Sequence, residues 1–183
     1  ISCGIILERG STKYSFDDIY QVALLERCRA NGMQVQREVP VTVRHRSFCK
    51  TYFLDLLAHH SVVYELKAVQ ALHPQHVAQL LNYLLLTGLP HGKLLNFRRG
   101  SVEWKFVSTH LSPAEIRKFE VHGSPGFDSS PGMRLFRTCL LDLLSDLGCF
   151  LDVALYREAM LHLLLPTGAC QRPVPITVEG TAV

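Results

Sequence analysis

Two carboxylates and one lysine interrupt apolar, strand-like runs in the first half of this chain. Asp55 lies in the run 51–58, and nine residues separate it from Glu65, which is followed two positions later by Lys67. Burying a charge is unfavourable unless the charge is paired or binds a metal. A divalent-metal site that hydrolyses phosphodiester bonds would explain why all three charges occur here.

The predicted strands would bring these three side chains together. Glu65 and Lys67 share one face because alternate residues of a strand point the same way. Asp55 lies on the preceding strand, and a short turn folds it back beside them. Mg²⁺ and Mn²⁺ prefer oxygen-rich sites of this kind. The alternative is an edge-strand Asp and a surface Glu–Lys pair, which is a common combination.

Lys67 would act on the water and the phosphate at such a site. A metal ion there would polarise the phosphoryl oxygen, lower the pKa of a bound water and stabilise the leaving oxygen. Lys67 could orient that water and offset charge in the transition state. The neighbouring metal is expected to depress the pKa of Lys67.

Two pairs of polar residues lie on predicted helices near this site. Gln79 and Tyr83 are four residues apart and share a helix face, from which they could bind the scissile phosphate. Asp17 and Tyr20 form a second pair, and Asp17 could add a contact to the metal. The alternatives are a helix rim for the first pair and stabilisation by the helix dipole for Asp17.

Basic residues occur near the predicted strand ends and could contact the phosphates of a nucleic acid. Such contacts make binding weaker at high salt. A solvated basic face is an equally weighted alternative. Together with Tyr20, the residues expected to bind nucleic acid are Arg44, Arg46, Lys93, Arg98 and Arg99.

Other residues with possible chemistry are assigned to structure. His59 and His60 are expected in a solvated turn, and His73 and His76 on the surface at a helix start. Trp104 could stack on a base, but a single strand Trp is more often a core residue.

The composition fits one folded domain with an anionic partner. The chain has 183 residues, 48% of them hydrophobic, and a formal net charge of +3. Its six cysteines form no Cys-x-x-Cys pair and fall mostly in apolar runs, which favours reduced core thiols in the cytoplasm. No apolar run is long enough to span a bilayer, so a membrane partner is not expected. A Gly-rich phosphate loop, zinc-ligand spacing and a nucleophile elbow are absent from the sequence.

Hydrophobic periodicity predicts an α/β protein with a mixed central sheet flanked by helices. The 111–132 segment is rich in turn residues and is interpreted as a linker between residues 1–110 and 133–183. Predicted helices cover 16–31, 74–88, 133–147 and 150–165, with a short one starting at 112–115, and predicted strands cover 35–43, 50–57, 62–69, 93–97 and 102–107.

The C-terminal segment contains a partial internal repeat. Residues 156–160 resemble residues 20–24, and residues 171–178 resemble residues 36–43. The second copy ends before any counterpart of Asp55 or Glu65. It is therefore expected to be catalytically silent.

The ordered set of motifs resembles the GxxExxY protein family, a bacterial branch of the PD-(D/E)XK nuclease superfamily. The resemblance covers about residues 1–108. Tyr14 replaces the motif Gly, and Asp17 replaces the motif Glu. The matching segments are 16–24, 55–57, 63–69, 78–84 and 93–97.

This resemblance implies a restriction-endonuclease-like fold and hydrolysis of DNA, with RNA as an alternative, using Mg²⁺ or Mn²⁺. It implies that Asp55 and Glu65 are metal ligands and Lys67 the catalytic lysine. Gln79 and Tyr83 would form the Gln-x-x-x-Tyr element. A catalytically inactive nucleic-acid-binding or assembly module, a purely structural interaction protein and a homodimer remain open alternatives.

Overall fold

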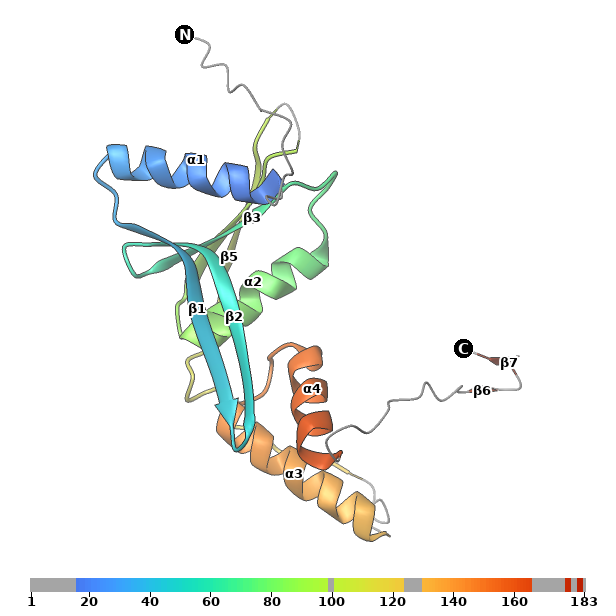
Figure 1. Ribbon diagram of the computed structural model, residues 1–183. Coiled ribbons are helices and arrows are strands. Elements are labelled where there is room, and N and C mark those ends of the chain that lie inside the picture. The colour runs from blue at the N-terminus through green and yellow to red at the C-terminus, as the bar shows by residue number, and fades with distance from the viewer. Residues whose placement is uncertain (1–15, 99–100, 124–129, 166–176, 179–180, 183) are drawn as a thin grey trace.

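A five-stranded mixed sheet forms the centre of the protein. The computed structural model describes residues 16–98, 101–123, 130–165, 177–178 and 181–182 (Figure 1). The strand order is β1-β2-β3-β4-β5, in which only the β3–β4 pair is parallel. The strands are β1 (Val35–His45), β2 (Phe48–Ala58), β3 (Val62–Lys67), β4 (His91–Asn96) and β5 (Glu103–Ser108).

Helices cover both faces of this sheet. Leu25 of α1 packs with Leu56 and Leu66, whereas Leu80 of α2 packs with Val63 and Leu94 on the other face. Since parallel strands need a crossover connection, α2 is the element that joins β3 to β4. The helices are α1 (Phe16–Ala30), α2 (Pro74–Thr87), α3 (Pro131–Leu147) and α4 (Val153–Leu164).

The predicted order of helices and strands is confirmed, and the ends of α2 show why it could be predicted. Pro74 occupies the first turn, where its missing N–H would have no helical partner. Gly88 ends the helix with a φ of +70°, which glycine adopts without strain. The short helix predicted to start at 112–115 does not form, because residues 113–117 form turns.

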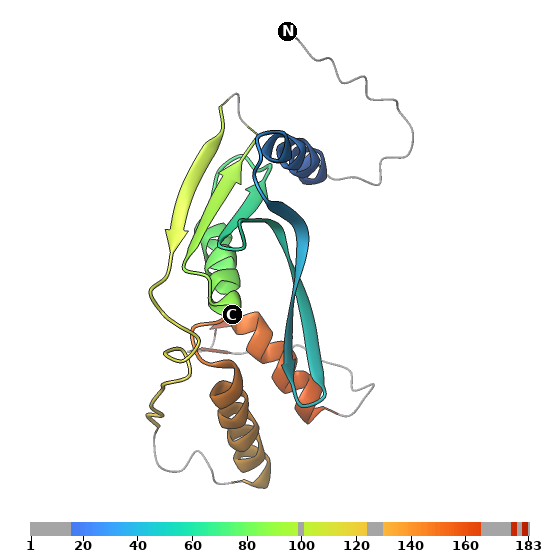
Figure 2. The ribbon, with the colours of Figure 1, turned by 90° about the vertical axis from the view of Figure 1, so that its left-hand side faces the viewer.

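The β1–β2 hairpin extends well beyond the rest of the sheet. Only residues 56–58 of β2 pair with β3, whereas residues 48–54 pair with β1 alone. The part of this hairpin that does not pair with β3, called the ribbon below, packs against α3 and α4 (Figures 1 and 2). In that contact, Val43 and Phe48 of the ribbon join Leu143 of α3 and Leu155 of α4.

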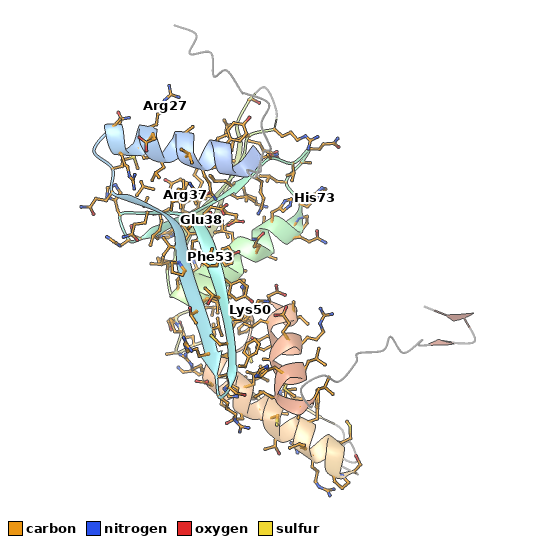
Figure 3. The ribbon with its side chains drawn as sticks, viewed as in Figure 1. Arg27, Arg37, Glu38, Lys50, Phe53 and His73 are labelled. Carbon is orange, nitrogen blue, oxygen red and sulfur yellow. The ribbon has the colours of Figure 1, made fainter. Side chains whose placement is uncertain are left out.

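Polar side-chain contacts reinforce the packing of the ribbon on the C-terminal helices. The imidazole of His45, which is 5% exposed, lies between two carboxylates of α3, 2.8 Å from Asp146 and 3.3 Å from Asp142. Lys50 donates a hydrogen bond of 2.6 Å to Glu158 of α4 (Figure 3). Charge pairs at partly buried positions fix the register of two surfaces more than they stabilise them.

The predicted repeat is not tested by these elements. The helix of the second copy corresponds to α4, but most of the 171–178 match lies outside the described residues. Its end, β6 (Thr177–Val178), pairs with β7 (Thr181–Ala182) and not with the main sheet.

Four of the six cysteines lie within the described residues, and all four are free thiols. Cys139 is buried, as the sequence predicts, but the expectation of a core position is wrong for Cys49, which is exposed. Among the described helices, none is long and apolar enough to cross a membrane.

Gly148 closes α3, and replacing it with alanine is expected to destabilise the protein by about 1–3 kcal/mol. Its φ is +90°, and an added Cβ would lie 2.6 Å from Ile116, a buried residue. The matched control is Gly132→Ala, where a Cβ meets nothing within 4 Å and helix propensity favours alanine. Urea unfolding of both variants checks this, and equal midpoints would contradict it.

Candidate active site

Asp55 and Glu65 lie at the point where β2 and β3 separate. The pairing of the two strands ends at Leu56 and Tyr64, so Asp55 and Glu65 are the next residues on each strand. The Asp55 carboxylate accepts a hydrogen bond of 2.7 Å from the backbone N–H of Leu66. This bond holds one carboxylate against the strand that carries the other.

The backbone is distorted beside Asp55. Leu54 and Leu57 both pack on the α2 side, although a regular strand would point them to opposite faces. Across the ladder, Glu38 of β1 has a φ of +53°, a left-handed conformation that is unusual for a residue with a side chain (Figure 3). Irregularities of this kind often re-aim side chains next to active sites.

Glu65 and Lys67 form a buried ion pair on the α2 side of the sheet. Glu65 is 1% exposed, and Lys67 Nζ donates a hydrogen bond of 2.6 Å to Glu65 Oε1. Burial lowers the pKa of Lys67, but Glu65 and then Asp55 outweigh it and raise that pKa above its ordinary value. The protein groups alone therefore raise the pKa of Lys67, whereas the sequence-based expectation is a lower pKa caused by a bound metal.

Helix α2 brings Gln79 and Tyr83 to the same site. Gln79 Nε2 donates a hydrogen bond of 2.9 Å to the Tyr83 hydroxyl. Burial raises the pKa of Tyr83, the Gln79 hydrogen bond lowers it, and the charges of Glu65 and Asp55 raise it further. Tyr83 is buried in the same core cluster as Val63 and Leu94, the neighbours of Glu65 on β3 and β4, so the phenol lies on the Glu65 side of the sheet.

The chemistry of this cluster fits a divalent cation. Two carboxylates face one ammonium, so the three groups carry an excess negative charge when all are ionised. Asp55 and Glu65 supply oxygen donors, which Mg²⁺ and Mn²⁺ prefer. Within the described residues, no group of three or more His, Cys, Asp or Glu side chains could hold a metal by itself. Any ion here would therefore depend on water or substrate oxygens, which is common for Mg²⁺.

A comparison with protein families gives the identity of this fold. The PD-(D/E)XK nuclease superfamily, through its PDDEXK_3 group, matches residues 8–107. The chain belongs to the PD-(D/E)XK nuclease superfamily. Its mixed sheet with flanking helices is the restriction-endonuclease-like fold, as the sequence predicts. Members of this superfamily are usually nucleases that act with divalent metals on nucleic acid.

A search of curated proteins found no match. A solved structure, described as the crystal structure of SSO0001, is similar with a TM-score of 0.42 and 20% sequence identity. The match covers 53% of this chain and 52% of that protein, so the chain spans about half the length of the protein it matches.

His76, a residue expected on the surface, lies on the same face of α2 as Gln79 and Tyr83. The side chain is partly buried, and its Nδ1 accepts a hydrogen bond of 3.0 Å from the backbone N–H of His73. Burial lowers the pKa of His76, and Lys67 and then His73 lower it further. The signal that could have found it is the spacing of three and seven residues to Gln79 and Tyr83, which gives one helix face.

Of the predicted pair on the first helix, Tyr20 lies on the α1 side of the sheet, apart from the carboxylate cluster. Tyr20 stacks on Phe97, with ring centroids 4.8 Å apart and planes at 10°. Asp17 lies in the first turn of α1, but its side chain is outside the described residues.

The predicted phosphate-binding residues are spread over two regions. Arg44 and Arg46 lie at the far end of the ribbon, where Arg46 pairs with Asp142 at 2.7 Å. Lys93 lies over the ring of Trp104 at 4.4 Å, on the sheet face opposite Glu65. Arg98 is exposed just after β4, and Arg99 is outside the described residues. Trp104 is 60% exposed, so the expectation of a core position is wrong.

Proposed function

We propose that this protein is a metal-dependent nuclease of the GxxExxY branch that hydrolyses phosphodiester bonds in DNA, with RNA as the alternative substrate. The observation that carries the proposal is the hydrogen bond from Leu66 N–H to Asp55. It fixes Asp55 beside the buried Glu65–Lys67 pair, where two carboxylates could hold Mg²⁺ or Mn²⁺. The superfamily match over residues 8–107 supports the same reading.

The protein groups have separate tasks in this proposal. Bound by Asp55 and Glu65, the metal ion supplies polarisation of the phosphoryl oxygen and a lower pKa for a nearby water. Lys67 would position the attacking water and donate hydrogen bonds to phosphate oxygens, which offsets charge in the transition state.

Gln79 and Tyr83 orient the substrate from the helix side. The raised pKa of Tyr83 keeps its phenol protonated at neutral pH. Its hydroxyl accepts from Gln79 and can donate its own hydrogen to a phosphate oxygen.

Titration with Mg²⁺ and a cleavage assay test the proposed function. The wild-type chain is expected to bind Mg²⁺ saturably and to cut DNA or RNA only when the ion is present. Asp55→Asn keeps the size of the side chain but removes its charge, and is expected to abolish both. Wild-type protein that neither binds Mg²⁺ nor cuts any DNA or RNA form would favour the catalytically inactive nucleic-acid-binding module.

Tyr83→Phe is expected to lower the cleavage rate about tenfold to a hundredfold, because one hydrogen bond to the phosphate is lost. The matched control is Tyr64→Phe, which changes the same residue type on β3 but on the α1 side of the sheet. Single-turnover rates of the two variants check the prediction. A Tyr64→Phe variant as slow as Tyr83→Phe would contradict a specific role for Tyr83.

A further inference from the structure

A groove runs directly beside the proposed active site. It lies between α2 and the loop that precedes α4, and its volume is about 400 Å³. Gln79 lines this groove and also bonds Tyr83, so the groove and the carboxylate cluster share a wall. The opposite wall carries Phe150 and Val153, which are 66% and 77% exposed.

Phe150 is held in this exposed position by the loop around it. Its φ is +69°, which strains a residue with a large side chain by about 1–3 kcal/mol. Cys149 N–H donates to Ile116 O at 2.6 Å, and Leu151 N–H donates to the Tyr156 hydroxyl at 3.1 Å. An aromatic ring kept in water by bonds on both sides of it is a preorganised contact surface.

The same loop is attached to the helix of the site. Asp152 N–H donates a hydrogen bond of 2.9 Å to Oδ1 of Asn82, a buried residue of α2. Asn82 directly precedes Tyr83 in the helix. The position of the Phe150 ring is therefore fixed relative to Gln79 and Tyr83, although the two segments are distant in sequence.

The lining of the groove favours a flat, uncharged ligand over a phosphate. None of the described residues that line it is basic. Its one acidic residue, Asp152, is engaged in capping α4 through a bond from Ala154 N–H to Oδ1. The remaining polar groups include the amides of Gln75 and Gln79, which can donate and accept hydrogen bonds. An aromatic ring opposite amide side chains is a chemistry suited to a nucleobase.

We infer that this groove binds one unpaired base of the nucleic-acid substrate, with Phe150 as the stacking surface. The inference rests on the proposed function and adds a preference to it. A base that is paired and stacked in a duplex cannot enter the groove without first leaving the stack. Substrates with a single-stranded segment are therefore bound and cut in preference to blunt duplexes of the same sequence.

Binding to a single-stranded oligonucleotide tests the inference without cleavage. Fluorescence anisotropy in EDTA is measured for the full-length wild type and for Phe150→Ala. Loss of the ring is expected to weaken binding about tenfold or more. Phe136→Ala, an exposed aromatic on α3, is the matched control and leaves the affinity unchanged.

Two further variants separate binding from folding. Phe150→Gly is expected to raise the melting temperature, because glycine adopts a positive φ without strain, and still to bind as weakly as Phe150→Ala. Phe150→Trp keeps an aromatic ring at this position and is expected to bind the single-stranded oligonucleotide about as tightly as the wild type. An oligonucleotide with abasic sites in place of bases is expected to bind wild type and Phe150→Ala equally.

The outcomes distinguish this inference from the proposed function. If the wild type cuts with Mg²⁺ but Phe150→Ala and Phe150→Gly retain full affinity for the single strand, the groove does not bind a base and the nuclease proposal stands. If the wild type binds no oligonucleotide and cuts none, the nuclease proposal fails and the inference fails with it.

Discussion

Glu65→Gln is expected to lower Mg²⁺-dependent cleavage on the order of 10³-fold, because the substitution removes a charged metal ligand and leaves the shape of the side chain unchanged. Glu65 is 1% exposed, so the surrounding protein fixes the position of its carboxylate. Its strand position is fixed by the parallel pairing with Leu94 of β4. The measurement is the single-turnover rate at saturating Mg²⁺, together with Mg²⁺ affinity by calorimetry.

The control for this loss is Glu103→Gln. Glu103 lies on the same side of the sheet and accepts a hydrogen bond of 3.1 Å from Asn96, but it is on β5, away from the separation of β2 and β3. Its substitution is expected to leave the cleavage rate within about twofold of wild type, as is usual for sites outside the chemistry. Equal rates for wild type and Glu65→Gln would overturn the assignment of Glu65.

The cluster could be predicted from sequence because strands and helices have fixed periods. Glu65 and Lys67 share a face by the strand repeat of two, and Gln79 and Tyr83 by the helix repeat near four. The order of elements then limits the fold, since the α2 crossover makes β3 and β4 parallel neighbours. The strand and helix repeats and the crossover rule depend only on spacing along the chain, so they can be applied to a single sequence.

The parts that could not be predicted depend on contacts between distant residues. The hydrogen bond from Leu66 to Asp55 requires a distorted strand, and nothing in the residue types around Glu38 indicates its positive φ. The ribbon contact depends on His45 meeting Asp142 and Asp146, which are about a hundred residues away. The bond from Asp152 to Asn82, which ties the Phe150 loop to α2, joins residues that are 70 positions apart, so the sequence around Phe150 does not indicate it.

The part of the chain interpreted as a linker also shows this limit. Turn residues such as Pro113 correctly indicate the absence of a long helix in 111–123. However, Ile116 within this segment is buried and packs in the same core as α3 and α4. Turn chemistry predicts the backbone conformation of a segment and not whether one of its side chains enters a core.

Lys67→Met is expected to destabilise the fold by about 3–5 kcal/mol, because it leaves the Glu65 carboxylate buried without the ammonium that lies 2.6 Å away. Lys67 and Glu65 side chains are 17% and 2% exposed, so water does little to replace the lost partner. Methionine has nearly the same length as lysine, which limits any cavity. Chemical denaturation at neutral pH measures the change.

The double variant Glu65→Gln/Lys67→Met distinguishes a charge effect from a packing effect. If the loss comes from an uncompensated charge, removing that charge restores most of the stability, and the two substitutions are strongly non-additive. If methionine simply packs badly, the double variant is at least as unstable as Lys67→Met. Cleavage stays absent in both cases, because the charges that stabilise the fold when paired are the ones that would hold the metal ion and the phosphate. Recovered stability without recovered activity would therefore show that the ion pair is retained for catalysis and not for folding.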